Sequence, residues 1–340
     1  MFRILHDTKF DFIKWWRWAA GLTAAFILAG LLSFVFRGGV NYSIEFTGGT
    51  LMQLEFTQPT DGGRVRSTLD RANIRGAEIQ QFGSDREYTI RVQNVAEVAE
   101  QSAGAERIAA RVRQALETEY GPQSYRVIRE ELVGPRVGAE LRRDAAIAMI
   151  LASLVTLVYL AIRFEWRFGV AAVLSTAHDV LITLAFIKLF HIEVSLTIIA
   201  GILTLLGYSG NDTIIIFDRV RENLKKDRKS PLYDLLNRSI NETLPRSVLT
   251  HATTLAATLA LLFFAGEVLR PFAIVMSWGI FVATFSSIYI ASPLLLWIEQ
   301  KWPRSAEKGR DAMSISASRA EAPPPGRAAR GRQPQGAGSR

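Results

Sequence analysis

Six runs of apolar residues, each long enough to cross a bilayer as a helix, dominate the hydrophobic pattern of this chain. An α-helix rises about 1.5 Å per residue, so about twenty apolar residues cover the hydrocarbon core. The pattern predicts an α-helical membrane bundle whose six spans run approximately over Trp16–Phe36, Ala145–Phe164, Phe168–Phe190, Ser195–Phe217, Ser247–Ala265 and Pro271–Trp297. The first run is as long as the others and lacks a small-residue cleavage site, so we expect a retained anchor after residues 1–15.

Residues 37–142, between the first two spans, change to the short alternating pattern of an α+β domain. Met52, Leu54 and Phe56 alternate as in a half-buried strand, and Thr60 is placed to cap a following helix. That helix carries Val65 and Leu69. Two strands follow, a short one at Ile79 and Phe82 and a second at Tyr88, Ile90 and Val92. A helix from about Ala96 to Tyr120 and a strand that begins at Tyr125–Val127 complete the domain. The order βαββαβ predicts a ferredoxin-like fold. Such a fold implies no activity, so we interpret the domain as a binding or force-transmitting module.

Residues 218–246, between spans four and five, predict an amphipathic helix. Ser230 and Pro231 resemble a helix start, and the apolar positions that follow are Leu232, Leu235, Leu236 and Ile240. Basic residues precede it, and each adds about 1 kcal/mol of attraction to anionic lipid. We therefore expect this helix to lie along the inner membrane surface against anionic lipid, and docking to a cytoplasmic partner is the alternative. The segment 303–340 is rich in Ala, Pro, Gly, Ser and Arg, which predicts a disordered basic cytoplasmic tail.

Basic residues gather in alternate loops, which predicts the orientation of the spans, because short loops rich in Lys and Arg remain in the cytoplasm. The basic residues on one side are Arg163, Arg167, Arg219, Arg221, Lys225, Lys226, Arg228, Lys229, Lys301 and Arg304. The opposite short loops, 191–194 and 266–270, hold one basic residue besides histidine. We therefore expect both termini in the cytoplasm and residues 37–142 outside.

The composition narrows the function classes. A net charge of +8 over 340 residues is scattered over the predicted cytoplasmic loops and tail, so topology explains it and no nucleic-acid partner is expected. The chain has no cysteine, hence no thiolate metal site and no thiol nucleophile. It also lacks the G-x-x-x-x-G-K-[ST] loop of ATP-binding proteins. We expect no metal, no cofactor and no enzymatic activity, and a proton or sodium gradient as the energy source.

Asp212 is the first functional candidate, because it lies inside the fourth apolar run. An aspartate near the centre of a membrane helix costs about 2.5–3.5 kcal/mol, so such residues are placed where a partner or a water-lined path receives them. Asp212 shares a helical face with Gly201, Thr204 and Tyr208, and Asn211 precedes it. Proton passage and a buried polar contact that fixes helix register are both open.

The pair His178-Asp179 near the middle of span three is the second candidate. Ser175, Asp179 and Thr183 share one face, and a histidine beside a carboxylate could relay protons near neutral pH. Adjacent residues point about 100° apart on a helix, so we expect His178 and Asp179 to serve different neighbours. The alternative is a simple hydrogen bond from Asp179 to an adjacent span.

Arg246 lies where the cytoplasmic loop becomes span five. Thr250, Thr254 and Thr258 follow at a spacing of four, with His251 beside them, and form a polar stripe. An arginine here could pair with a carboxylate and act as a switch, or its side chain could simply extend to the membrane surface.

Six sequence blocks together resemble the SecD/SecF family of bacterial protein-export membrane proteins over about residues 1–302. The blocks are Glu45-Phe46-Thr47-Gly48-Gly49-Thr50, Val133–Leu141, Ala177-His178-Asp179, Gly207–Thr213, Phe217–Asn223 and Asn241–Arg246. Any one of them alone is a weak signal, and Gly48-Gly49 by itself could be only a tight turn. All six, in order and in correctly oriented spans, are typical of this family.

The resemblance implies a resistance-nodulation-division type fold, in which these spans form half of a pseudo-symmetric bundle that a SecD subunit completes in the bacterial inner membrane. It implies that the proton-motive force is used to complete preprotein translocation. The implied partners are SecD, the SecYEG translocon, YajC and the SecA-driven preprotein. By position, Asp212 matches a proton-path carboxylate and Arg246 the arginine that works with it, while Phe46, Gly48 and Gly49 match a motif of the outer domain.

These residues suggest a mechanism in which protonation of Asp212 weakens its pairing with Arg246, lets the spans shift and reorients the outer domain. Asp212 lies about 8 Å from the inner end of its span at 1.5 Å per residue, so an approach is plausible. Four residues depart from the family pattern, namely Ser43, Glu45, Pro245 and His251. Pro245 is tolerable at a helix start, and His251 could add a titratable group.

Two other functions compete with this one. A proton-coupled exporter of small molecules or lipids would share the fold, but such exporters usually carry twelve spans and larger outer domains. An intramembrane aspartyl protease would use Asp179 and Asp212 as a pair sharing a proton. The sequence contexts of that class are absent around both residues.

Overall fold

The computed structural model describes residues 8–36, 38–74, 76–81, 84–93, 104–227, 229–266 and 268–302. They belong to two compact units, Met1–Leu296 and Trp297–Arg340. In the second unit, the described residues form the end of α10 (Ser292–Lys301), where Lys301 lies 5.0 Å from the ring centroids of Trp297 and Trp302. The predicted disordered tail, residues 1–7, Phe82 and the predicted helix start at Ala96 lie outside the described residues.

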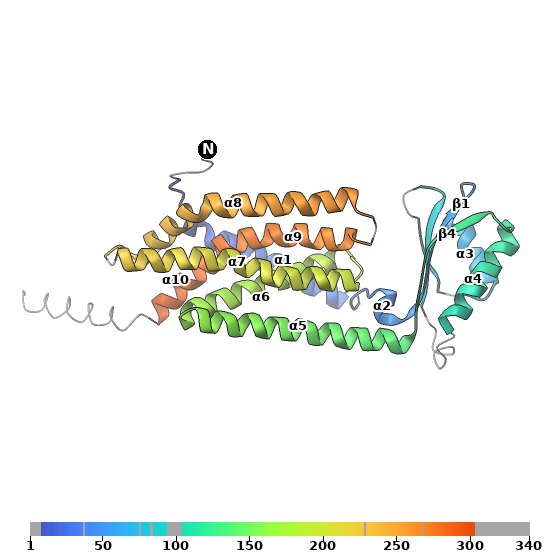
Figure 1. The fold of residues 1–340 in the computed structure, drawn as a ribbon, viewed down its shortest axis with the longest axis horizontal. Helices are drawn as coiled ribbons and strands as arrows, with labels where there is room; N and C mark the ends of the chain where they lie inside the picture. Colours follow the sequence, from blue (N-terminus) through green and yellow to red (C-terminus); the bar gives the residue numbers. More distant parts are fainter. Residues whose placement is uncertain are drawn as a thin grey trace, which may run out of the picture. The chain divides into compact units, whose positions relative to one another are not determined.

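Six helical segments of the described chain are long and apolar enough to cross a membrane, in agreement with the six predicted spans. The six helices are α1 (Trp16–Phe36), α5 (Pro135–Arg163), α6 (Trp166–Leu189), α7 (Leu196–Lys226), α8 (Leu232–Phe264) and α9 (Arg270–Ser286). The short helix η1 (Ile13–Trp15) precedes α1, and the π-helical turn η3 (Ser287–Ala291) and α10 continue α9. α7 packs against α5, α6, α8 and α9, and it is the central helix of the bundle (Figure 1).

Several helices extend beyond their apolar runs. α5 begins at Pro135, and α7 continues to Lys226. The predicted amphipathic helix between spans four and five is the first part of α8, continuous with the fifth span. Once a helix has formed, each further residue adds a hydrogen bond, so polar flanks continue it where hydropathy shows no span. Pro245 therefore lies inside a helix, and its predicted position at a helix start is wrong.

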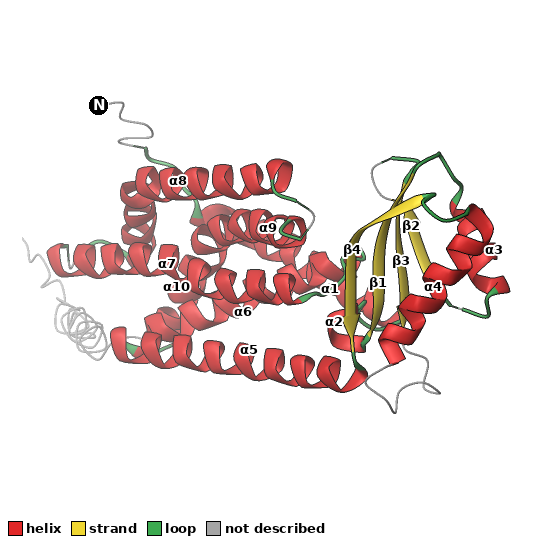
Figure 2. Cartoon of the chain, turned by 45° about the vertical axis from the view of Figure 1, so that its right-hand side comes forward, coloured by secondary structure: helices red, strands yellow, loops and turns green. Residues whose placement is uncertain are grey.

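The sheet domain contains a four-stranded antiparallel sheet in the order β2-β3-β1-β4. Its elements are α2 (Ile44–Thr47), β1 (Gly49–Phe56), α3 (Gly62–Arg71), β2 (Glu78–Gln81), β3 (Glu87–Gln93), α4 (Gly104–Tyr120) and β4 (Tyr125–Val133). From β1 onward the order is the predicted βαββαβ, and α3 and α4 lie on one face of the sheet (Figure 2). The N-cap of α3 is Asp61, so the predicted cap Thr60 is wrong. The Thr60 hydroxyl instead lies 3.1 Å from that of Tyr120.

Alternating strand residues and one face of each helix form the core of this domain. Met52 and Leu54 of β1 meet Leu69 of α3 and Val112 and Leu116 of α4, all fully buried. Fully burying a side chain of this size stabilises by about 1.5–3 kcal/mol. The period-2 pattern of the strands and the helical period of α3 and α4 therefore converge on one core, as the sequence predicts.

Candidate functional site

Asp212 lies on the buried face of α7 and is 2% exposed. Its Oδ1 accepts a hydrogen bond from Ser247 of α8 at 2.5 Å, and its Oδ2 accepts one from Ser287 of η3 at 2.6 Å. Three segments of the bundle therefore meet at this carboxyl group. Among the described residues, no arginine or lysine donates to Asp212.

Serine hydroxyls suit a carboxyl group that gains and loses a proton. A hydroxyl both donates and accepts, so Ser247 and Ser287 can donate to the carboxylate and one of them can accept from the carboxylic acid. An arginine has donors only, and it would favour the ionised form alone. The surroundings of Asp212 thus provide hydrogen bonds for both protonation states.

Asp179 on α6 is held in the same way and is fully buried. Its Oδ2 accepts from Ser209 of α7 at 2.5 Å and from Ser286 of α9 at 2.7 Å. His178 Nδ1 lies 3.0 Å from Asp179 Oδ1, so the prediction that these neighbours serve different partners is wrong. The two side chains diverge at Cβ, but the imidazole is long enough to turn back to the carboxyl group of the next residue.

Sequence reasoning missed the two consecutive serines of the last span, Ser286 and Ser287. The first donates to Asp179 and the second to Asp212. The only signal in the sequence is a set of serines inside an apolar run, and such residues are often satisfied by their own helix. Only the fold brings them against carboxylates that lie more than seventy residues away in sequence.

The remaining predicted site residues occupy different environments. Arg246 is exposed on α8, and the expected pairing of Arg246 with Asp212 is not made in this conformation. Asn211 is exposed, and Thr250 is partly buried. His251 is buried, with its Nδ1 2.8 Å from the carbonyl oxygen of Ser247 and its ring 5.4 Å from that of Tyr208. His251 therefore adjoins a donor to Asp212 instead of the carboxyl group itself.

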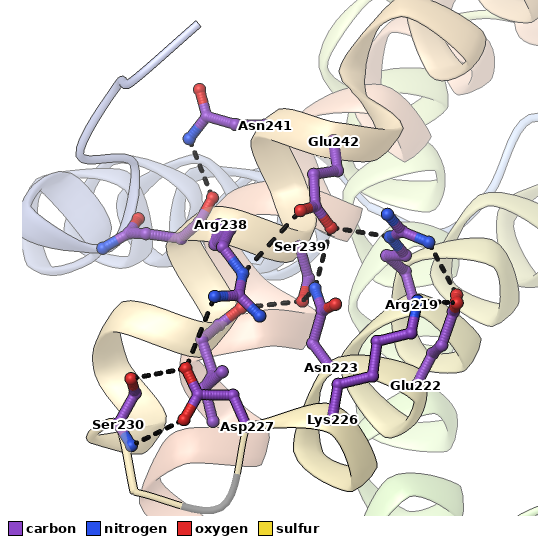
Figure 3. Close-up of polar contacts among 12 residues, drawn as sticks. Arg219, Glu222, Asn223, Lys226, Asp227, Ser230, Arg238, Ser239, Asn241 and Glu242 are labelled. Atoms are coloured by element: carbon purple, nitrogen blue, oxygen red, sulfur yellow. Dashed lines mark hydrogen bonds and ion pairs between the residues drawn. The ribbon is translucent and has the colours of Figure 1, made fainter. Parts of the chain in front are cut away.

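The end of α7 is tied to the start of α8 through Glu242 (Figure 3). This carboxylate accepts from Arg219 Nε at 2.6 Å and from Asn223 Nδ2 at 2.8 Å, both on α7. Arg238, one turn earlier on α8, lies 3.7 Å from it. Two sequence blocks of the family resemblance, Phe217–Asn223 and Asn241–Arg246, therefore meet at one ionic contact. The contact fixes the register of α7 against α8, on which Ser247 faces Asp212.

The segment that precedes the first span is also held by α8. The Asn241 amide donates to the Phe10 carbonyl at 2.9 Å and accepts from the Phe10 amide at 3.0 Å. Asn237 accepts from the amides of Phe12 and Ile13. Asp11 accepts from Tyr233 at 2.6 Å, and this hydrogen bond is the main cause that lowers the pKa of Asp11. A cavity of about 840 Å³ opens beside these contacts.

The motif residues Phe46, Gly48 and Gly49 form the joint between the bundle and the sheet. Phe46 is buried in a cluster with Val194, Ile198 and other residues of the bundle. Gly48 and Gly49 follow with φ values of 74° and 155°, which glycine adopts most readily. A Cβ on Gly138 of α5 would lie 2.9 Å from Gly48 N, so the close approach of α5 to this turn requires a glycine at position 138.

A second contact joins the sheet to the bundle through charge. Arg91 of β3 donates to Glu193 in the loop between α6 and α7, and it also pairs with Glu78 of β2 at 3.1 Å. Burial raises the pKa of the Glu193 carboxyl, and Arg91 opposes that effect. Arg91 Nε and Glu193 Oε1 are buried without hydrogen-bond partners among the described residues.

Two family models match parts of the chain that include five of the six long apolar helices of the described residues. Residues 112–301 match the family described as "Protein export membrane protein SecD/SecF, C-terminal", and residues 33–60 match "SecD/SecF GG Motif". The protein translocase subunit SecF of Gemmatimonas aurantiaca is 65% identical over 305 residues, which cover 89% of this chain and 91% of that protein. The SecF of Escherichia coli O157:H7 is 38% identical over 297 residues, covering 87% and 90%.

Solved structures give the same result. The crystal structure of SecDF, a translocon-associated membrane protein from Thermus, superimposes with a TM-score of 0.74 at 38% identity. The match covers 88% of this chain and 40% of the SecDF chain. SecDF in a super-membrane-facing form gives a TM-score of 0.61 at 37% identity, with coverages of 94% and 41%. The chain thus spans about two fifths of the length of each SecDF chain.

Proposed function

Because this chain belongs to the SecF branch of the SecD/SecF family of protein export membrane proteins, we propose that it uses the proton-motive force, together with a SecD subunit, to complete preprotein translocation. The relatives are named as protein translocase subunits, and the role of the chain is that of a non-catalytic accessory subunit. The observation that carries the proposal is Asp212, a carboxyl group buried inside a membrane bundle and surrounded by hydroxyls that satisfy either protonation state.

A SecD subunit completes the bundle in this proposal. The SecDF chains are about 2.5 times as long as the matched part, which leaves room for a second half in each. On this chain most of the apolar surface of α5 is exposed. Its exposed residues include Ile150, Leu154 and Tyr159. Lipid and a neighbouring helix both suit such a surface. SecYEG, YajC and the SecA-driven preprotein remain partners expected from the family resemblance, and anionic lipid remains a partner expected from the basic residues before α8.

We infer that the sheet domain is ferredoxin-like and lies outside the membrane, with both termini in the cytoplasm. Its βαββαβ order and antiparallel β2-β3-β1-β4 sheet support the first point. The concentration of basic residues at the α7–α8 end of the bundle supports the second. The joint at Phe46, Gly48 and Gly49 would transmit a shift of the spans to the sheet.

Arg246 enters the cycle in a different conformation from the one described. It precedes Ser247 on α8, so a rotation of that helix that withdraws the serine would bring the arginine toward Asp212. We propose that the two donors alternate, with Arg246 favouring the ionised carboxylate and Ser247 allowing the protonated one. Asp179 and His178 form a second candidate proton site, because Asp179 is also buried and accepts hydrogen bonds from two serines.

The rival functions have less support. An exporter of small molecules or lipids would share the bundle, but the relatives from Gemmatimonas aurantiaca and Escherichia coli are named as translocase subunits. For an aspartyl protease, Asp179 and Asp212 would need to share a proton, whereas each accepts from a separate pair of serines.

Translocation into membrane vesicles that contain this chain and SecD tests the proposal. Asp212→Asn is expected to keep ATP-driven insertion and to lose most of the stimulation by an imposed proton gradient, because the amide binds no proton in this range. Asp218→Asn is the matched control, since Asp218 lies on the same helix but pairs with Arg163 at an exposed site. Equal stimulation in wild type and Asp212→Asn would reduce Asp212 to a structural contact.

A further inference from the structure

Ser286 and Ser287 each have one hydroxyl hydrogen and two acceptors within reach. The hydroxyl of Ser287 lies 2.6 Å from Asp212 Oδ2 and 3.1 Å from the carbonyl oxygen of Thr284. That of Ser286 lies 2.7 Å from Asp179 Oδ2 and 3.3 Å from the carbonyl oxygen of Ala283. A hydroxyl donates to one strong acceptor at a time, and an ionised carboxylate is the stronger of the two. The acceptor that each serine uses therefore depends on the charge of its carboxyl group.

The two serines stand at a break in the regular helix. α9 ends at Ser286, and the π-helical turn η3 begins at Ser287, where the Ser292 hydroxyl donates to the Ser287 carbonyl at 3.1 Å. Single π turns inside α-helices are uncommon and are frequent at functional sites. The carbonyl of Thr284, to which Ser287 turns, belongs to the last regular turn before the break. A change of donor there acts on backbone that is already irregular.

We propose that Ser286 and Ser287 are positioning residues that transmit the protonation states of Asp179 and Asp212 to the backbone of the last span. The proposal rests on the proposed proton-coupled function and assigns that function its mechanical output. When a proton bonds to Asp212 Oδ2, the acid donates to Ser287 Oγ, and the hydrogen of Ser287 turns to the Thr284 carbonyl. The added proton stays on the carboxyl group, and its release reverses both hydrogen bonds.

Other titratable or charged groups face this region from the elements packed around it. They are His178 on α6, Tyr208 on α7, His251 on α8 and Tyr289 on η3. Of these, only His178 contacts either carboxyl group directly. His178 therefore contributes to any change at Asp179 when the pH changes. At Asp212 the direct contacts are the hydroxyls of Ser247 and Ser287.

The test measures the two carboxyl groups separately in vesicles that contain the complex with SecD. A hydrophobic carbodiimide modifies protonated carboxyl groups, and mass spectrometry of peptides gives the extent at each aspartate. Ser287→Ala is expected to raise modification of Asp212 about tenfold at fixed pH, because the carboxylate loses one charge-assisted donor. Asp179 should change less than about twofold, and Ser286→Ala should give the reverse pattern. Ser277→Ala, on the same helix but bonded to Thr258 at 3.0 Å, is the matched control.

A second readout follows the backbone of the last span. Amide hydrogen exchange at Ser287–Ala291, corrected for its intrinsic pH dependence, should differ between the protonated and ionised states of the wild type. Ser287→Ala should abolish that difference, and Ser287→Thr, which keeps the hydroxyl, should restore it. A merely structural serine would alter exchange equally in both states.

The outcomes separate this proposal from the proposed function. Unchanged modification of both aspartates in Ser286→Ala and Ser287→Ala, or exchange at η3 that ignores protonation in the wild type, would overturn the role of the serines even if the gradient drives translocation. Absence of gradient stimulation in the wild type would overturn the proposed function, while the modification and exchange data would still decide whether the serines report protonation.

Discussion

The contact between Arg91 and Glu193 predicts an asymmetric response to mutation. The side chains are 18% and 30% exposed, and burial raises the pKa of Glu193 despite the adjacent arginine. Removing the arginine therefore leaves a carboxylate in an environment that disfavours its charge. Removing the charge of the glutamate relieves that penalty. We expect Arg91→Gln to weaken docking of the sheet on the bundle and Glu193→Gln to leave it nearly unchanged.

The magnitude follows from the exposure of the pair. Breaking a fully buried ion pair from one side costs about 3–5 kcal/mol, and partial exposure reduces this to about 1–2 kcal/mol here. At 1.4 kcal/mol per factor of ten, docking should weaken by about 5- to 30-fold in Arg91→Gln. Glu78→Gln is the control, because it removes only the outer, 64% exposed partner of Arg91 and should cost less than about 1 kcal/mol.

Amide hydrogen exchange at Val194 and Leu196 measures the docking. Val194 N donates to Asn41 O at 2.7 Å, and Leu196 N donates to Glu45 at 2.6 Å, so both amides are protected only while the joint is closed. The raised pKa of Glu193 also determines whether docking strengthens or weakens as the pH rises. The docked state holds its proton more tightly than the undocked one, so docking is strongest below the ordinary value of 4.5 and weakens as pH rises through the docked pKa. Equal effects of Arg91→Gln and Glu193→Gln, or weaker docking in acid, would refute this reasoning.

Two further predictions concern the joint and the segment before the first span. Gly138→Ala should lower the stability of the complex by about 1–3 kcal/mol in thermal unfolding, because the added Cβ would lie 2.9 Å from Gly48 N and 3.1 Å from the Phe46 carbonyl. Gly134→Ala is the control and should change the stability little, because nothing lies within 4 Å of its Cβ. Equal effects of the two substitutions would contradict the close packing at Gly138. Asn241→Leu should free the segment around Phe10 and speed its proteolysis at least several-fold, because the variant loses two hydrogen bonds to the Phe10 backbone of about 1 kcal/mol each. Asn211→Leu, at an exposed position on α7, should leave cleavage unchanged.

Several parts of the structure follow from local pattern alone. Apolar runs of about twenty residues have one stable arrangement in a bilayer, so six spans could be read from hydropathy. The period-2 pattern around Met52 and the helical pattern around Leu69 likewise predicted the order of elements in the sheet domain. Asp179 and Asp212 stood out because charge is costly at these positions. Boundaries were less accurate, as in α8, because hydropathy does not register polar residues that continue a helix.

Residue types along the chain were enough to establish the class of protein and the two carboxyl groups, because each of these depends on a local stretch of sequence. The family followed from six such stretches in order. The packing of the helices settled which donors those groups meet. Ser247, Ser286 and Ser287 approach them only when α6, α7, α8 and the π turn pack together, and Arg246, one residue from Ser247, is left outside. A rotation of about 100° per residue makes adjacent positions on a helix face different neighbours, and no local pattern fixes which of them faces inward.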